Sequence, residues 1–478
     1  MSRIYLLIGL LFLYVSAAQA QIPSRDSSLV LTQEQFLEWV ENFHPIARQG
    51  DLLLEFGDQE LRMARGGFDP LLYGDYNNKE FRGTTYFDTR EIGMIIPTWA
   101  GIELKGLFEQ NSGRFLNPER TVPTDGLFAA GISVNLGQGL LIDRRRAALR
   151  QAQIFQESTL VERRKFLNDL YLDANLAYWN WSEAHENRLV FEEGLQLAEI
   201  RFQAIKESFV QGDLPAIDTV EAYTQVLDRL YRYQDAMIEY FNAMQLVNTF
   251  LWDDELNEIN LTDAILPESV LTLEIDRVSN VQLRNALAGH PDIQLIDFDI
   301  ATLNVDRRWK AEQLRPIIKV NYNFLTENMG PNMEIPAFFQ NDYKWGINIS
   351  TPLFLRRERG GLGLAKAKIN FADQRRELRF VQLEASLEQA IYRFGLVEDQ
   401  FRVFSANIQG LERLLDGEKV RFELGESSLF LINAREVALF DSKVTLNDLA
   451  AKRKIAYVRM LHAAGFGFDF ENALEQFD

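Results

Sequence analysis

The chain of 478 residues contains no cysteine and only four histidines. Without cysteine it can form no disulfide, and a bacterial lipid anchor is excluded because that anchor needs a cysteine directly after an export signal. Few histidines and no thiols leave little material for a metal or thiol active site. No nucleophile–base pair or nucleotide-binding fingerprint stands out either. We therefore expect no cofactor, no metal and no enzymatic activity.

Positive charge and proline are also scarce. Sixty-nine acidic residues outnumber 50 basic ones, which gives a formal net charge of -19. A nucleic-acid-binding protein needs a basic face, so we expect no nucleic-acid partner. No proline occurs between Pro123 and Pro215 or after Pro352, and both stretches can therefore hold long uninterrupted helices.

The first twenty residues predict a secretory signal. Arg3 supplies a positive start, an apolar stretch follows from Ile4 to Val15, and Ala18-Gln19-Ala20 fits a cleavage site. The apolar stretch is short for a membrane span, which needs about 20 residues, so an N-terminal anchor helix is the weaker alternative. The mature chain is expected to begin at Gln21.

The sequence repeats itself. Three early features recur 246 residues later, whereas two later features recur at offsets of 215 and 213. We infer two copies of one long unit, residues 21–260 and 261–478, with an insertion of about 31 residues in the first copy. The matching segments are His44-Pro45 and His290-Pro291, Pro70 and Pro316, Tyr76-Asn77 and Tyr322-Asn323, Ile132–Leu136 and Ile347–Thr351, and Phe209–Gly212 and Phe422–Gly425.

Each copy opens with a helix and continues with apolar and polar residues in alternation, for example from Ile318 to Phe324 and from Tyr343 to Ile349. Alternation predicts strands with one apolar face. A soluble sandwich and a membrane barrel with aromatic girdles explain this pattern equally well. The insertion around residues 87–111 is also strand-like and predicts an extended hairpin or an extra surface loop.

Very long helices follow the strands. Apolar residues recur with a strict step of seven in each copy, which is typical of a coiled-coil seam. Each helix is predicted to have about 60–70 residues and a length of roughly 100 Å. A glycine turn ends each one, and a shorter helix returns. The rows are Leu160, Leu167, Ala174, Trp181, Leu195, Phe202 and Phe209 in copy one, and Phe380, Leu387, Phe394, Phe401, Ile408, Leu415 and Phe422 in copy two.

Two strand pairs from one chain leave open edges, which a membrane does not tolerate. Several chains must then share one barrel, and the long helices would continue it as a tube. The pattern therefore favours an oligomeric conduit. The main rival is a structural coiled-coil protein of the cell surface or periplasm, which explains the heptads but not the strands.

At this point the chain resembles the outer membrane efflux protein family, the TolC-like channels, over nearly its whole mature length. The resemblance rests on the repeat, on the early His-Pro where the family commonly has Asn-Pro, and on a turn signature, G-x-x-x-x-x-D-V-x-x-A. Residues 212–222 match this signature except that Thr219 stands where the signature has valine; Val220 follows it. Copy two departs from it, because Gly425 to Ala434 is one residue shorter.

The resemblance implies a homotrimer in the outer membrane, with four strands per chain in a twelve-stranded barrel and a coiled-coil tunnel that extends into the periplasm. It implies passive export together with an inner-membrane pump, in tripartite efflux or type I secretion, through a periplasmic adaptor protein. The implied adaptor-docking tips are Gly212, Asp213, Leu214, Gly425, Glu426 and Ser427. The implied pore gate contains Asp218, Glu221, Asn433, Arg435 and Glu436.

Overall fold

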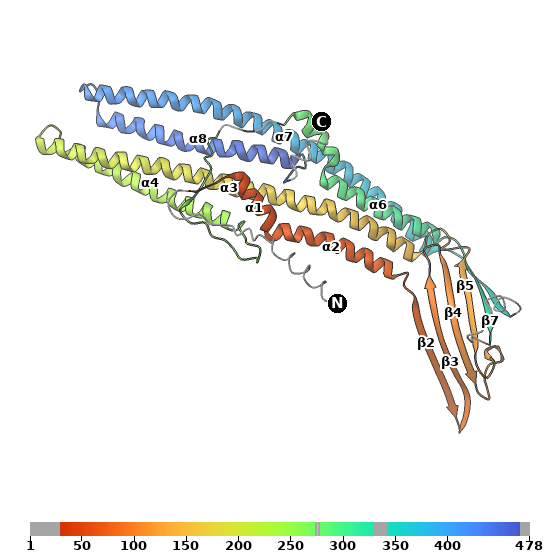
Figure 1. Cartoon of the computed structure of the whole chain (residues 1–478). Helices are drawn as coiled ribbons and strands as arrows, with labels where there is room; N and C mark the ends of the chain where they lie inside the picture. Colours follow the sequence, from red (N-terminus) through yellow and green to blue (C-terminus); the bar gives the residue numbers. More distant parts are fainter. Residues whose placement is uncertain (1–28, 273–274, 276–277, 328–341, 469–478) are drawn as a thin grey trace, which may run out of the picture.

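The computed structural model describes residues 29–272, 275, 278–327 and 342–468, so the predicted signal of residues 1–20 lies outside the described residues. These residues form a long layer of helices with a sheet at one end (Figure 1). None of the described helices is long and apolar enough to cross a membrane.

Two helices of 68 residues each dominate the structure and confirm the predicted long helices. They are α3 and α7, and each is followed by a return helix, α4 or α8. The helices are α1 (Gln33–Phe43), α2 (Pro45–Gly66), α3 (Arg144–Gln211), α4 (Ala216–Asn248), α5 (Asn280–Ala286), α6 (Pro291–Glu312), α7 (Arg356–Glu423) and α8 (Leu429–Ala463), with 3-10 turns at Pro118–Arg120 and Leu287–Gly289.

The main sheet has six antiparallel strands in the order β2-β3-β4-β5-β7-β8. A separate parallel pair joins β1 to β6 at the middle of the helical layer. The strands are β1 (Leu29–Leu31), β2 (Leu71–Phe81), β3 (Thr84–Pro97), β4 (Ile102–Ser112), β5 (Leu127–Asn135), β6 (Ile265–Pro267), β7 (Ile317–Thr326) and β8 (Tyr343–Ser350).

The sheet differs from the expectation of four strands per chain, because it contains six. The insertion around residues 87–111 forms the hairpin β3–β4, which lies within the sheet and pairs with β2 on one side and β5 on the other. It is therefore an extended hairpin and not an extra surface loop. The physical reason is that both of its strands alternate apolar and polar residues in register with their neighbours, so their backbone groups find partners on both sides.

The helix α3 lies at the centre of the helical layer. Near the sheet it packs against α2 and α6, and α6 packs against α7. Near the turns it packs against α4 and α8, and α8 packs against α7 (Figure 1). The layer therefore has two edges, one formed by α2 and α4 and the other by α7.

Much of the predicted heptad rows lies in the core. Leu167, Ala174 and Trp181 of α3 are buried, as are Leu387 and Phe401 of α7. Burial of one apolar stripe per helix stabilises such long helices, because helix propensity alone contributes little.

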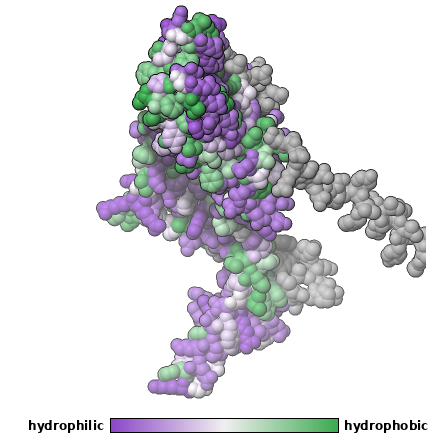
Figure 2. Space-filling model, turned by 90° about the vertical axis from the view of Figure 1, so that its left-hand side faces the viewer, coloured by the Kyte–Doolittle hydropathy of each residue, from purple (hydrophilic) through white to green (hydrophobic). Residues whose placement is uncertain are grey.

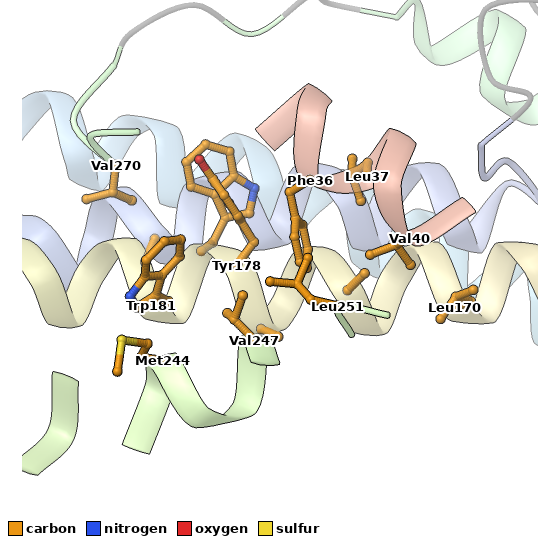
Figure 3. Close-up of a cluster of buried hydrophobic side chains, with 14 of the residues drawn as sticks. Phe36, Leu37, Val40, Leu170, Tyr178, Trp181, Met244, Val247, Leu251 and Val270 are labelled. Atoms are coloured by element: carbon orange, nitrogen blue, oxygen red, sulfur yellow. The ribbon is translucent and has the colours of Figure 1, made fainter. Parts of the chain in front are cut away.

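A compact core surrounds the middle of α3 (Figure 3). Phe36 of α1 stacks on Tyr178 of α3, Val40 lies further along α1, and Val247 of α4 closes the other side. The Tyr178 hydroxyl donates to the Leu31 carbonyl at 2.7 Å and accepts from the Glu268 amide at 3.0 Å. These bonds hold the β1–β6 pair against α3, and burial raises the pKa of Tyr178.

The repeated His-Pro pairs begin two helices of 22 residues, α2 and α6. Nδ1 of His44 accepts the Ile46 amide and Nδ1 of His290 accepts the Asp292 amide, each at 3.1 Å. Both histidines have extended backbone, as expected before proline. They satisfy amides that the first helical turn leaves unpaired.

Core packing beneath α5 can be tested with two residues of one helix. Leu283 is fully buried beside Leu387 and Leu461, whereas Val281 is 65% exposed. Leu283→Ala is expected to lower the free energy of unfolding by about 2–5 kcal/mol because it leaves a cavity. Thermal unfolding of the purified protein measures this, with Val281→Ala as the control. Equal effects of the two substitutions would contradict the assignment of this core.

The buried cap at α6 predicts a loss of stability in acid. Burial lowers the pKa of His290 from 6.5 to about 4, so the folded protein holds its imidazole neutral. Its stabilising effect is complete above pH 6.5 and is lost as the pH falls toward 4, because the unfolded chain binds the proton more tightly. His290→Asn keeps a capping oxygen but cannot titrate. We expect the melting temperature of this variant to fall less over this pH range than that of the natural protein. An equal fall in both proteins would rule out His290 as a source of the acid sensitivity.

Candidate functional site

The predicted tips are two tight turns of the same kind at one end of the molecule (Figure 1). Gly212 and Gly425 both have left-handed backbone, with φ of 86° and 77°. The amides of Gly212 and Asp213 bond back to the carbonyls of Phe209 and Ser208, and the turn at Gly425 repeats this pattern. Only glycine adopts this conformation without strain, so the turns end the long helices sharply.

Apolar side chains are exposed next to both turns. Val210 and Ile217 are 78% and 68% exposed, and Leu424 and Phe430 are 70% and 66% exposed. Between α3 and α4 a groove of about 400 Å³ continues this surface. Exposed apolar surface of this kind is typical of a site where another protein packs.

Two predicted gate residues lie at the start of α4. Asp218 is half-buried in the first turn, where the helix dipole favours its charge. In the part of the chain that the structure describes, its carboxylate has no ion-pair partner. Glu221, one turn further, accepts a hydrogen bond from Nδ2 of Asn433 at 3.4 Å.

Two of the predicted gate residues, Asn433 and Glu436, meet at an arginine that sequence reasoning missed. Nη1 of Arg201 in α3 donates to Oδ1 of Asn433 at 3.0 Å and to Oε2 of Glu436 at 2.6 Å. A second nitrogen of Arg201 donates to Oε1 of Glu436, which makes this pair bidentate. Because Asn433 also bonds to Glu221, the cluster joins α3, α4 and α8.

A second arginine is buried beside this cluster. Arg229 of α4 is 3% exposed, and its guanidinium lies 4.9 Å from the centre of the Phe440 ring. Burial lowers the pKa of Arg229, and the nearby Glu436 carboxylate opposes that shift. The negative charge of Glu436 therefore acts on two arginines, the half-buried Arg201 and the buried Arg229.

The other tip has a carboxylate that also escaped prediction. Glu418 of α7 is buried; its Oε1 accepts the Ser427 hydroxyl at 2.5 Å, and its Oε2 lies 3.8 Å from Nε of Arg435. The structure thus brings Ser427 and Arg435 together through Glu418. Sequence spacing could not reveal Glu418 or Arg201, because their partners lie on other helices.

The six-stranded sheet has two chemically different faces. The register places most of its apolar residues on one side, which we call the apolar face, and many of these are exposed. The apolar face comprises Leu72, Tyr76, Ile92, Met94, Ile96, Ile102, Leu104, Phe108, Phe128, Ile132, Val134, Ile318, Val320, Tyr322, Phe324, Tyr343, Trp345, Ile347 and Ile349.

The opposite side, the polar face, carries most of the charged and amide side chains of the sheet, together with some apolar ones such as Leu107 and Leu325. Its members include Asp75, Asn77, Glu91, Glu103, Lys105, Glu109, Asn111, Asn135, Lys319, Asn321, Asn323, Lys344 and Asn348. Glu103 and Asn135 also line a hollow of about 1770 Å³ bounded by α2, α3, α6 and α7. The polar face therefore continues into a space along the helical layer. Figure 2 shows hydrophobic side chains where the sheet leaves the helices and mostly hydrophilic ones toward its far end.

Both edges of the helical layer carry exposed apolar stripes. On α7, Leu364, Phe371 and Leu378 follow one another at seven-residue steps and are 59%, 71% and 59% exposed. The opposite edge has exposed apolar residues on both of its helices. They are Leu52, Phe56 and Met63 of α2 and Val220, Leu227, Tyr231, Ile238 and Phe241 of α4. Exposed seams with heptad spacing indicate helix partners that one chain does not supply.

The buried cluster predicts unequal effects of two substitutions on α8. The Glu436 side chain is 6% exposed, whereas Asp441, which pairs with Arg232, is 52% exposed. Glu436→Gln leaves the half-buried Arg201 without its ion-pair partner and removes a carboxylate near the buried Arg229, so it is expected to cost about 3–5 kcal/mol. Asp441→Asn breaks an exposed pair and is expected to cost less than about 1 kcal/mol. Chemical denaturation measures the free energy of unfolding of both variants. Equal losses would show that the cluster contributes no more to stability than the exposed pair does.

The fold is that of known outer-membrane proteins, although the sequence matches no protein family and no curated protein. The CmeC outer membrane channel of Campylobacter jejuni aligns with a TM-score of 0.65 at 13% identity, over 93% of this chain and 88% of that one. The MtrE outer membrane channel of Neisseria gonorrhoeae gives 0.64 at 14% identity, over 94% of each. VceC, an outer membrane protein of Vibrio cholerae, gives 0.63 at 13% identity, over 91% and 96%. The chain therefore has the fold of outer-membrane channels, as its sequence resemblance predicts.

Proposed function

We propose that this protein is the outer-membrane exit channel of a tripartite efflux system, and that three copies form one conduit. The observation that carries the proposal is the two-faced sheet, continued by long helices whose outer edges are apolar. In this arrangement the strands form a barrel in the outer membrane, and the helices form a tunnel through the periplasm. Solutes pass passively, and the chain performs no chemistry.

The exposed apolar face suits contact with lipid. Trp345 and Ile349 are 60% and 69% exposed, and in water such a broad apolar surface would be unfavourable. A membrane barrel turns apolar residues outward and polar residues toward a water-filled lumen. The main-sheet strands have 8–14 residues, close to the 9–11 that a tilted membrane strand needs.

The open edges of the sheet require other copies. The unpaired edges of β2 and β8 would leave backbone groups without partners in lipid. Because an even number of strands separates them, β8 of one copy can pair antiparallel with β2 of the next. The apolar stripes on α2, α4 and α7 support the same side-by-side assembly. We adopt three copies because the family resemblance implies a trimer.

The turns at Gly212 and Gly425 suit docking of a periplasmic adaptor that couples the channel to an inner-membrane pump. Exposed Val210, Leu424 and Phe430 offer apolar contacts there. Just behind the tips, Asp218 supplies a carboxylate with no ion-pair partner in the described part of its own chain. Three copies would bring three such carboxylates around one axis, where like charges keep the helices from closing tightly and favour cations.

Electron microscopy and bilayer conductance test this function. Negative-stain images of the detergent-purified mature protein are expected to show a threefold cylinder with a long tube. The same sample is expected to conduct ions in planar bilayers. A solid rod that does not conduct would favour a coiled-coil scaffold and overturn the proposal.

The gate hypothesis predicts an effect of Asp218 on closed-state current. Asp218→Ala removes a carboxylate from the narrowest part of the proposed tunnel and is expected to raise leak conductance. Single-channel recording in planar bilayers measures this. Asp213→Ala, a change of the same kind in the turn itself, serves as the control. Unchanged leak in Asp218→Ala would argue against a gate role for this residue.

The exposed seam on α7 predicts that one added charge prevents assembly. Phe371→Glu places a carboxylate in the stripe where a neighbouring copy would pack, and we expect loss of the trimer because an unpaired charge would be buried. Asn370→Glu adds the same charge one residue away, outside the stripe. Light scattering in detergent measures the oligomeric state. A Phe371→Glu protein that remains trimeric would show that this stripe does not form the contact.

A further inference from the structure

The inserted hairpin β3–β4 changes the size of the sheet. It separates β2 from β5, which would otherwise be neighbours, and raises the number of strands in the sheet to six. In an assembled barrel, this part of the sheet would either belong to the closed wall or extend beyond it into water. Three features of the structure indicate that it forms part of the barrel wall.

The first feature is continuity of the apolar face. Ile92 and Met94 of β3 and Leu104 of β4 are 59%, 42% and 42% exposed. The register places them on the same face as the apolar residues of the neighbouring strands. Phe108 of β4 packs against Phe128 of β5, with ring centres 4.5 Å apart. A loop in water would leave this apolar strip uncovered, whereas lipid would cover it.

The second feature is anchoring on the polar face. Oε1 of Glu103 in β4 accepts a hydrogen bond from Nη1 of Arg145 at 3.0 Å, and its Oε2 lies 3.4 Å from Nζ of Lys319. Arg145 belongs to the first turn of α3, and Lys319 to β7. The Glu103 carboxylate of the insertion thus connects the hairpin, the second copy of the repeat and the start of α3. A hairpin that peels away from the sheet would lose both ion pairs.

The third feature is a match of width between sheet and helices. Strands lie about 4.8 Å apart and tilt by about 40° in a barrel, so six of them span an arc of about 38 Å and four span about 25 Å. The adjoining layer contains α2, α3, α6 and α7. Four helices packed 8–10 Å apart span about 32–40 Å. Six strands therefore continue the helical layer without narrowing, whereas four would force a taper.

We propose that the inserted hairpin widens the exit, so that three copies close an eighteen-stranded barrel of nearly the same bore as the helical tunnel. This inference rests on the proposed trimeric channel. Barrel diameter grows roughly linearly with strand number, so the exit is about 1.5 times as wide as one built from four strands per chain. A barrel of this size holds an aqueous channel, which suits bulky solutes.

Cryo-electron microscopy of the full mature chain in lipid nanodiscs tests the inference by counting strands. Six strands per copy in a closed trimeric wall is the expected result. A trimer with four strands per copy in the wall, and with β3–β4 outside it, would overturn the wide exit but leave the channel function intact. A protein without a trimeric barrel would overturn both.

Cysteine labelling gives a second, independent readout, because the natural chain has no cysteine. If the hairpin is wall, Lys105→Cys reacts with a water-soluble maleimide, while Leu104→Cys on the apolar face is protected by lipid. Asn348→Cys and Ile347→Cys of β8 are the matched controls, since β8 lies in the wall in either arrangement. Equal reaction at Leu104→Cys and Lys105→Cys, beside unequal reaction in the controls, would overturn the inference.

Discussion

The packing of α3 is the interaction on which the rest of the structure depends. This one helix contacts α2 and α6 near the sheet, and α4 and α8 near the turns. Its middle carries Tyr178 and Trp181, around which α1 and the β1–β6 pair assemble. Small residues such as Ala174 and Ala177 let neighbouring helices approach closely. Without a buried seam along its full length, a helix of 68 residues would not be stable.

The same apolar periodicity produces two outcomes. Inside the layer, the seams of α3 and α8 are covered by other helices of the same chain. At the edges, Phe371 of α7 and Phe241 of α4 point to surfaces that one chain leaves open. The sheet shows the same incompleteness, because among the described residues its two edge strands lack partners on one side. Further copies of the chain would therefore complete both the helical layer and the sheet, at the same two edges.

The sequence predicted those features that depend on local chemistry. His-Pro marks a helix start because the imidazole can cap it, and a glycine turn ends a helix because of its left-handed backbone. Heptad rows reveal long helices because their spacing is set by helix geometry within one segment. The sheet has six strands where four were expected, since alternation in residues 87–111 does not reveal which strands will be neighbours. Arg201 and Glu418 were missed because each finds its role only through residues on another helix or turn.

The hairpin insertion also has a topological consequence. In the proposed channel, an antiparallel wall reverses direction at every strand, so one extra strand between β2 and β5 would deliver the chain to the far rim, with α3 on the wrong side of the membrane. Two extra strands return it to the original side and leave the helices undisturbed. The calibre of such a pore can therefore evolve only in even steps, two strands per chain at a time, while the machinery in the periplasm stays unchanged.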